Sequence, residues 1–161
     1  IDAIRSCRDV DERRRILKDP HTGSFAVVGV VILMLLTFGL FASGNPEADY
    51  KALVYITVIS RICSAFFVTV LPPMETSQFS GEYRKGVKKG HVAYLAIMFV
   101  AVTLSAAVFC GSYALVCPAV LVGYLIALAH AYSSLESMNG NIAGYSLVIG
   151  EFCGIAAFTL L

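Results

Sequence analysis

The sequence has few charged residues and no tryptophan. Charged residues make up 14% of its 161 positions, against roughly 25% in soluble domains, while 58% of the residues are hydrophobic. This composition argues against a water-soluble globular domain. Without tryptophan, an aromatic belt at a membrane surface depends on tyrosines near the ends of the apolar runs. These are Tyr50, Tyr83, Tyr94, Tyr113 and Tyr132.

Familiar catalytic and binding patterns are also missing. The sequence has no P-loop, GxGxxG, GxSxG, HExxH or CxxC pattern, each of which would point to a defined chemistry. The net charge of +1 provides no bulk attraction for nucleic acid, so we expect no nucleic-acid partner. The five cysteines are an odd number, and Cys63, Cys110 and Cys153 lie in or beside apolar runs without metal-ligand spacing. We expect buried free thiols there rather than a disulfide framework.

The beginning of the sequence shows no signal-peptide pattern. It starts at Ile1, without a methionine and inside a charged segment. We therefore expect a fragment of a longer protein that lacks the N-terminal part.

Five apolar runs, separated by short polar stretches, dominate the rest of the sequence. An α-helix needs about 20 residues to cross a bilayer, and each run is close to that length. The expected fold class is therefore all-α: a polytopic membrane bundle of about five transmembrane helices, forming one integral-membrane domain over residues 1–161. A charged helix over Asp9–Lys18 precedes the bundle. The runs are Ser24–Phe41, Ala52–Leu71, Val92–Phe109, Ser112–Ala131 and Ile142–Leu161.

The basic residues lie in alternate polar segments and so predict the orientation. Short loops rich in Lys and Arg face the cytoplasm. The segment before the first run and the loop between the second and third runs carry most of them, whereas Cys110–Gly111 leaves room only for a tight turn. We expect a functional face in the cytoplasm, built on three polar segments. They are Asp2–Phe25, Pro72–His91 and Ser133–Asn141.

Two charges, Arg61 and Glu151, lie in the middle of apolar runs. A charge at this depth costs on the order of 3 kcal/mol by insertion scales, so it usually faces a partner or water. Helical spacing places Arg61 on one face with Thr57, Ser60 and Ser64. Two interpretations stay open: an Arg61–Glu151 ion pair that locks the bundle, or an Arg61 that contacts an anionic substrate while Glu151 orients it.

A pair of small residues lies beside Glu151. Gly150 and Gly154 are four residues apart in the last apolar run. This spacing is typical of helices that approach each other closely in membranes. We therefore expect a close helix contact at these two glycines.

Two polar segments carry candidate ligands. After Lys18, Pro20 breaks the charged helix, and Thr22, Gly23 and Ser24 place backbone N–H groups at the next helix start, where anions bind. In the last loop, Glu136, Asn139 and Asn141 beside Gly140 offer oxygen atoms that suit Mg²⁺. The Asn139–Gly140 pair alone is also typical of a simple turn.

The order of these segments resembles the cobalamin synthase family, the adenosylcobinamide-GDP ribazoletransferases. Asp2–Ala3 resembles the end of the family's acidic stretch, and the segment from Lys18 to Phe25 resembles its (K/R)DxxxGxx motif. Val58–Ala65 resembles the family's Ser-Arg helix, with Arg61 as the arginine, and Glu136–Glu151 resembles its C-terminal GGxTGDxxGxxxxxxE segment. The resemblance covers nearly the whole sequence, as a C-terminal portion of the family's chain.

The resemblance implies a Mg²⁺-dependent transferase of cobalamin biosynthesis in a bacterial plasma membrane. A ribose hydroxyl of α-ribazole, or of its 5′-phosphate, would attack the ring-attached phosphate of adenosylcobinamide-GDP. GMP would leave, and adenosylcobalamin or its phosphate would form. An inactive relative stays open, because the family's Gly-Gly is Glu136–Ser137 here and its Asp is Asn141.

The resemblance also implies roles for individual residues. Asp2 and Asp19 would hold the metal, and Lys18, Asp19 and Arg61 would be catalytic, with Lys18 and Arg61 balancing phosphate charge. Glu151, Ser64 and Glu136 would support these groups or serve the structure. The substrate-binding residues would be Lys18, Thr22, Gly23, Ser24, Arg61, Asn139, Gly140 and Asn141.

Other functions stay open at this stage. A CDP-alcohol phosphotransferase would show paired DG/AR motifs, and a transporter subunit would continue its polar residues to both membrane faces; the sequence shows neither pattern. A structural membrane scaffold would need Arg61 and Glu151 only for each other. The expected partners are the small-molecule substrates and the lipid bilayer, and a homo-oligomer or an association with other proteins of the pathway stays open.

Overall fold

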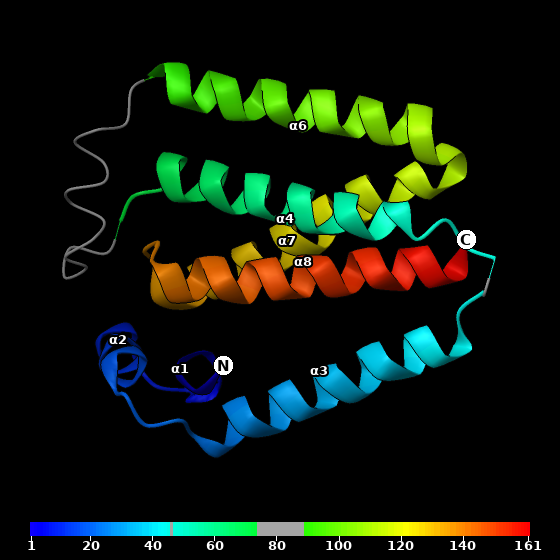
Figure 1. The fold of residues 1–161 in the computed structure, drawn as a ribbon. Coiled ribbons are helices and arrows are strands. Elements are labelled where there is room, and N and C mark those ends of the chain that lie inside the picture. The colour runs from blue at the N-terminus through cyan, green and yellow to red at the C-terminus, as the bar shows by residue number, and fades with distance from the viewer. Residues whose placement is uncertain (46, 74–88) are drawn as a thin grey trace.

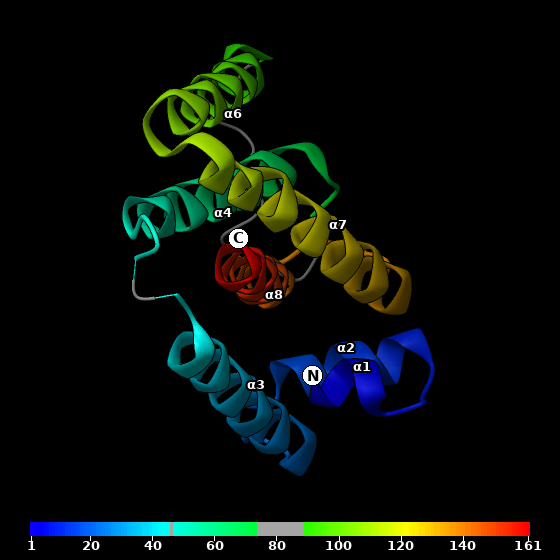
Figure 2. The same ribbon diagram turned by 90° about the vertical axis from the view of Figure 1, so that its right-hand side faces the viewer.

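A computed structural model describes residues 1–45, 47–73 and 89–161 (Figures 1 and 2). The described residues form two short helices, five long ones and a single 3-10 turn, and they contain no strand. The elements are α1 (Asp2–Arg5), α2 (Val10–Lys18), α3 (Ser24–Ser43), α4 (Lys51–Val70), α6 (Lys89–Cys110), η1 (Gly111–Leu115), α7 (Val116–Leu135) and α8 (Gly140–Leu160).

The long helices are apolar enough to cross a membrane, as the sequence predicts. Four helical stretches of the described residues meet this criterion of length and composition. The third, Gly90–Leu135, is 46 residues long. It comprises α6 from Gly90 onward, the turn η1 and α7, and the helices α6 and α7 run in opposite directions (Figure 1). The fold class, an all-helical polytopic membrane bundle with a charged helix before it, is confirmed. The stretches are Ser24–Ser43, Ala52–Val70, Gly90–Leu135 and Gly140–Leu160.

The turn between α6 and α7 lies where the sequence predicts it, but α7 begins later than expected. Gly111 has φ +57°, a left-handed conformation that favours glycine. The following residues continue as the 3-10 turn η1 and not as the start of a membrane helix, so α7 begins at Val116 rather than Ser112. Pro118 then falls in the first turn of α7, where its missing N–H costs no helical hydrogen bond.

The core of the bundle lies where α4, α7 and α8 meet. Glycines allow the close approach: a Cβ atom added to Gly154 would lie 2.5 Å from Val120 Cγ2 and 3.0 Å from Ile56 Cγ2. A Cβ atom added to Gly150 would lie 3.0 Å from the carbonyl oxygen of Val120. The predicted helix contact at Gly150 and Gly154 is confirmed. The most enclosed side chains around it are Tyr124, Ile59, Val120 and Cys117.

Helix α3 stands apart from this core (Figure 2). It has no buried residue, and its side chains suit contact with lipid rather than with protein. All five cysteines are free, as expected. Cys63 and Cys110 are buried as predicted, and so is Cys117, whereas Cys153 is only half-buried because it lies at the edge of the helix contact, and Cys7 is exposed.

We expect Gly154→Ala to destabilise the bundle. The added methyl group would meet Val120 and Ile56 in a packed core, and overpacking of this kind costs about 1–3 kcal/mol. Thermal unfolding in one detergent measures the effect. Gly144→Ala on the same helix is the control, because a Cβ there meets nothing within 4 Å. Equal stability of the two variants would contradict the close contact.

Candidate active site at one end of the bundle

Polar segments from distant parts of the sequence meet at one end of the bundle, on the left of Figure 1. Helices α1 and α2, the start of α3, the end of α4 and the α7–α8 connection all lie there. The N–H of Met138 donates a hydrogen bond to the carbonyl of Pro72 at 2.9 Å. The predicted gathering of three polar segments is confirmed for their described residues. Arg84, Lys85 and Lys88, which carry the orientation signal of the loop between the second and third apolar runs, lie outside the described residues.

Asp2 holds the start of α3. Its Oδ2 accepts a hydrogen bond from the N–H of Gly23 at 3.1 Å, and its Oδ1 accepts one from the N–H of Ala26 at 3.1 Å. A carboxylate is stabilising at a helix N-terminus. The predicted anion position at Thr22–Ser24 is therefore occupied in this structure by the protein's own carboxylate. A Cβ on Gly23 would lie 2.5 Å from Asp2 Oδ1, so this contact needs glycine.

Two arginines of α2 hold the end of α7. Arg13 Nη1 donates to the carbonyl of Ser134 at 3.3 Å, and Arg14 Nε donates to that of Leu135 at 3.1 Å. The last carbonyls of a helix have no partner within it, and cations are favourable there. The sequence interpretation treated these arginines as an orientation signal and missed this role. No pairing signal in the sequence links them to a helix end 121 residues away.

The loop between α2 and α3 is exposed. Lys18 is the last residue of α2, and Asp19, Thr22 and Ser24 are also exposed. Asp19 Oδ1 accepts a hydrogen bond from the N–H of His21 at 2.9 Å and lies 2.7 Å from its Nδ1. These contacts, the backbone N–H first, lower the pKa of Asp19 below its ordinary value. Asp19 is therefore ionised at neutral pH and one of its oxygens is already engaged.

The α7–α8 connection presents polar groups at the same end. Glu136 is exposed and has φ 53°, which ends α7 in a left-handed conformation. Asn139 is the N-cap of α8, and its Oδ1 accepts from the N–H of Ile142 at 2.9 Å. Gly140 and Asn141, both exposed, begin the helix. The connection is therefore a capped helix start, and the side chain of Asn141 is accessible to a ligand.

Arg61 and Glu151 form an ion pair near the middle of α4 and α8. Arg61 Nη1 lies 2.7 Å from Glu151 Oε1, which also accepts a hydrogen bond from Ser60 Oγ at 2.8 Å. Arg61 Nη1 also donates to the carbonyl of Thr57 at 3.1 Å. The Arg61 side chain is nonetheless 59% exposed, against 26% for Glu151. The pair satisfies the carboxylate, while much of the Arg61 side chain remains exposed.

The predicted site residues therefore fall into two groups. Asp2, Lys18–Ser24 and Glu136–Asn141 lie at the end of the bundle, where Asp2 contacts Gly23 directly. Arg61 pairs with Glu151 about 14 Å further along α4, at 1.5 Å per residue from Val70. Ser64 is half-buried, one turn from Arg61. The described structure does not bring Arg61 together with Lys18 and Asp19.

Comparison with known proteins places the chain in a family. The family model described as cobalamin-5-phosphate synthase matches residues 1–159. The chain belongs to the cobalamin-5-phosphate synthase family. This membership confirms the resemblance drawn from the order of the sequence motifs. No solved structure matches the chain.

Curated relatives carry the name adenosylcobinamide-GDP ribazoletransferase. One from Clostridium perfringens is 33% identical over 156 residues, covering 96% of this chain and 62% of that protein. One from Clostridium botulinum is 30% identical over 158 residues, with the same coverage. One from Lachnoclostridium phytofermentans is 27% identical, covering 92% of this chain and 57% of the relative. The chain thus spans about three fifths of the length of these relatives.

The described residues of this family member do not complete a metal site. No group of three or more His, Cys, Asp and Glu residues that could hold an ion occurs among them. Both oxygens of Asp2 accept backbone hydrogen bonds, and Asp19 Oδ1 is engaged by His21. Mg²⁺ is usually bound by one or two carboxylates together with waters and substrate phosphates. Because both Asp2 oxygens already serve the start of α3, the described residues alone do not form such a site.

We expect Asp2→Ala to loosen the first turn of α3. Losing an N-cap acceptor costs about 0.5–2 kcal/mol, so the amides of Gly23 and Ala26 should exchange their hydrogens faster. Asp2→Asn keeps one carbonyl acceptor and should show a smaller effect. Hydrogen exchange followed by mass spectrometry on the α3 peptide measures both. Unchanged exchange in Asp2→Ala would contradict the capping role.

We expect Arg61 and Glu151 to be energetically coupled. Arg61→Ala leaves an unpaired carboxylate at mid-span, so it should destabilise the bundle more in the presence of Glu151 than in the Glu151→Gln background. The unfolding free energies of the two single variants and the double variant should reveal a coupling of about 1–3 kcal/mol. The control replaces Arg61→Ala with Lys18→Ala in the same cycle. The changes in unfolding free energy of Lys18→Ala and Glu151→Gln should add in the double variant. Additivity for Arg61 as well would show that the pair contributes nothing to stability.

Proposed function

We propose that the protein is a membrane transferase that joins adenosylcobinamide-GDP to α-ribazole or its 5′-phosphate. The family match over residues 1–159 carries this proposal. The names of the relatives state the reaction class. A CDP-alcohol phosphotransferase and a transporter subunit receive no support from the family match.

The proposed reaction is a phosphoryl transfer without a covalent intermediate on the protein. A ribose hydroxyl oxygen attacks the phosphorus attached to the cobinamide, its proton passes to solvent, and the bond to the GMP oxygen breaks. Such reactions depend on positioning and on cations that balance the phosphate charge. Exposed polar groups at the end of an apolar bundle suit this chemistry, because two bulky hydrophilic substrates can reach them from the water.

Within this proposal, the end of α2 binds phosphate. Lys18 is an exposed cation beside the start of α3, and Thr22 and Ser24 present exposed hydroxyls next to it. Asn141 lies exposed on the α7–α8 side of the same end. Lys18 would balance phosphate charge, while Thr22, Ser24 and Asn141 would orient the substrates.

Arg61 belongs to the proposal as a second cation for the substrate phosphates. The support is its exposed side chain, which pairs with Glu151 through Nη1 among the described residues. A substrate phosphate would have to reach about 14 Å along α4 from the end of the bundle to contact it. Glu151, held by Ser60, would fix the orientation of the guanidinium.

We also propose that the reaction requires Mg²⁺, which when bound would neutralise charge on the transferred phosphate. Asp2 and Asp19 are the acidic candidates at the end of the bundle. Because they do not complete a site, further ligands would come from parts of the protein outside the described residues. The cytoplasmic face of a bacterial plasma membrane is the proposed location, in agreement with the basic segments of the sequence.

The test is GMP release by the full-length protein in lipid vesicles. Vesicles with adenosylcobinamide-GDP, α-ribazole and Mg²⁺ should release GMP, and chelation of Mg²⁺ should stop it. Absence of GMP release from folded protein with either acceptor would refute the proposal.

Lys18→Ala should lower kcat/KM for adenosylcobinamide-GDP by about 10-fold to 100-fold, because hydrogen bonds to charged groups contribute about 1.5–3 kcal/mol. Arg15→Ala is the matched control on the same helix, an exposed cation that pairs with Glu12 at 3.4 Å. Its kcat/KM should stay within about twofold of the wild type, since exposed pairs contribute little. Equal losses of kcat/KM in Lys18→Ala and Arg15→Ala would show that Lys18 does not bind the substrate.

A further inference from the structure

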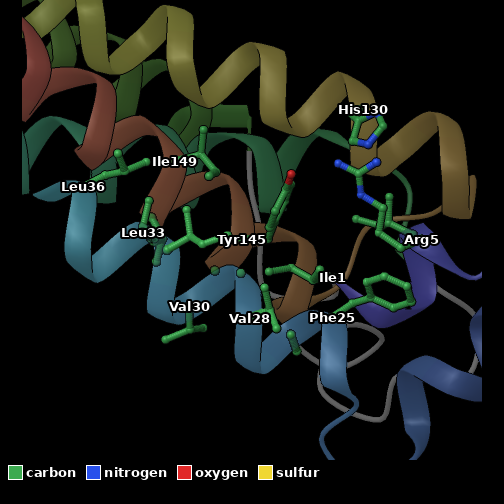
Figure 3. A pocket seen from close by; sticks show the side chains of 16 residues that line it. Ile1, Arg5, Phe25, Val28, Val30, Leu33, Leu36, His130, Tyr145 and Ile149 are labelled. Carbon is green, nitrogen blue, oxygen red and sulfur yellow. The ribbon is translucent and has the colours of Figure 1, made fainter.

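A groove of about 700 Å³ runs between α3 and the rest of the molecule (Figure 3). Helix α3 forms one wall, α8 the other, and α1 with the end of α7 closes one end. The volume is in the range of small-molecule sites, roughly 300–1,000 Å³. Most of the lining is aliphatic or aromatic, and the walls include Val28, Leu33, Leu36, Val148 and Ile149.

The groove exists because α3 touches the rest of the molecule at a few points and not along its whole length. Asp2 fixes the first turn of α3 through two hydrogen bonds. At the other end, a Cβ on Gly44 would lie 3.6 Å from Thr159 Cγ2 of α8. Between these points no residue of α3 is buried. Ile1 reaches α3 between these points, since a Cβ on Gly29 would lie 2.7 Å from Ile1 Cδ1. The rest of the space between the apolar walls is open among the described residues.

The groove has one polar end, and its charge is positive. Arg5, His130 and Tyr145 line it there, and the guanidinium of Arg5 points toward the ring of His130 in Figure 3. Arg5 and His130 are exposed, and no acidic residue lines the groove. This end lies at the same end of the bundle as the polar segments of the candidate active site.

The length of the groove matches one leaflet of a bilayer. Its lining extends along α3 from Phe25 to Leu36, which is about 16 Å at 1.5 Å per residue. Half of a hydrocarbon core about 30 Å thick is about 15 Å. An apolar channel of this depth, with a cation at the membrane surface, has the shape and charge of an acyl chain below an anionic headgroup.

We propose that this groove binds one anionic phospholipid, with its phosphate at Arg5 and an acyl chain between α3 and α8. The lipid supplies the apolar contacts that α3 does not obtain from the bundle. Bound there, it fixes α3 against α8 and so steadies the helix start that carries Gly23 and Ser24. This site is separate from the ion pair of Arg61 and from the phosphate position at Lys18.

The test compares lipid binding by the full-length protein in detergent, using native mass spectrometry with phosphatidylglycerol or phosphatidylcholine. We expect one phosphatidylglycerol bound in preference to phosphatidylcholine. Arg5→Ala should weaken that preference about fivefold, from the roughly 1 kcal/mol that one basic residue contributes near anionic lipid. Arg8→Ala is the matched control, because Arg8 is exposed and pairs with Glu12 at 3.2 Å. Equal binding of the two lipids, or equal effects of Arg5→Ala and Arg8→Ala, would overturn the proposal.

A second pair of variants tests the channel itself. Leu33→Trp fills the groove and should abolish binding of the specific lipid, whereas Leu35→Trp, at a 65% exposed position of α3 outside the lining, should leave it intact. A photo-crosslinking residue at position 33 gives an independent result in unaltered membranes. An adduct with lipid supports the proposal, and an adduct with protein, whether a second copy or another segment, refutes it. None of these measurements depends on GMP release, so the lipid site and the proposed reaction are tested separately.

Discussion

Hydrogen bonds to helix ends hold the polar end of this molecule together. Asp2 accepts from the first turn of α3, and Arg13 and Arg14 donate to the last carbonyls of α7. Helix ends leave backbone groups without partners, and an unpaired group in an apolar setting costs several kcal/mol. Helices α1 and α2 bury only Ala3 fully, while Ile4, Ile16 and Leu17 pack partly buried against the core. Their position therefore depends on these polar bonds together with this limited apolar packing.

This arrangement has a consequence for the proposed chemistry. The side chains that fix the scaffold and those proposed to bind substrate come from the same short segments. Asp2 and Asn139 are engaged in capping helices, while Lys18, Thr22, Ser24 and Asn141 are exposed beside them. Rigid caps hold the loops in place, and the exposed neighbours are the groups available to a ligand. A substitution of a capping residue would thus affect substrate binding by displacing the exposed side chains beside it, and not by removing a direct contact with the substrate.

The ion pair of Arg61 and Glu151 has a different role, because it compensates two charges near the middle of α4 and α8. Glu151 receives bonds from both Arg61 and Ser60, so its carboxylate is not exposed alone to lipid. Arg61 stays largely exposed, which a purely structural lock would not require. The structure shows the ion pair that joins α4 to α8, and the exposure of the Arg61 side chain is compatible with the proposed contact to a substrate phosphate.

The sequence alone determined the class of fold, the apolar helices, the turn at Gly111 and the family. These follow from composition, from run length and from motif order, which are local properties of the chain. It also identified Gly150 and Gly154 as a helix contact, because small residues at this spacing have few other uses in a membrane.

Only the tertiary structure decided what the polar residues contact. Asp2 lies 21 residues from Gly23, and Arg13 lies 121 residues from Ser134; their bonds arise from the way the helices pack, which no local pattern encodes. The same packing separates Arg61 from Lys18 and opens the groove beside α3. A sequence lists the charges and the apolar faces, but their partners are fixed by distances that exist only in the folded bundle.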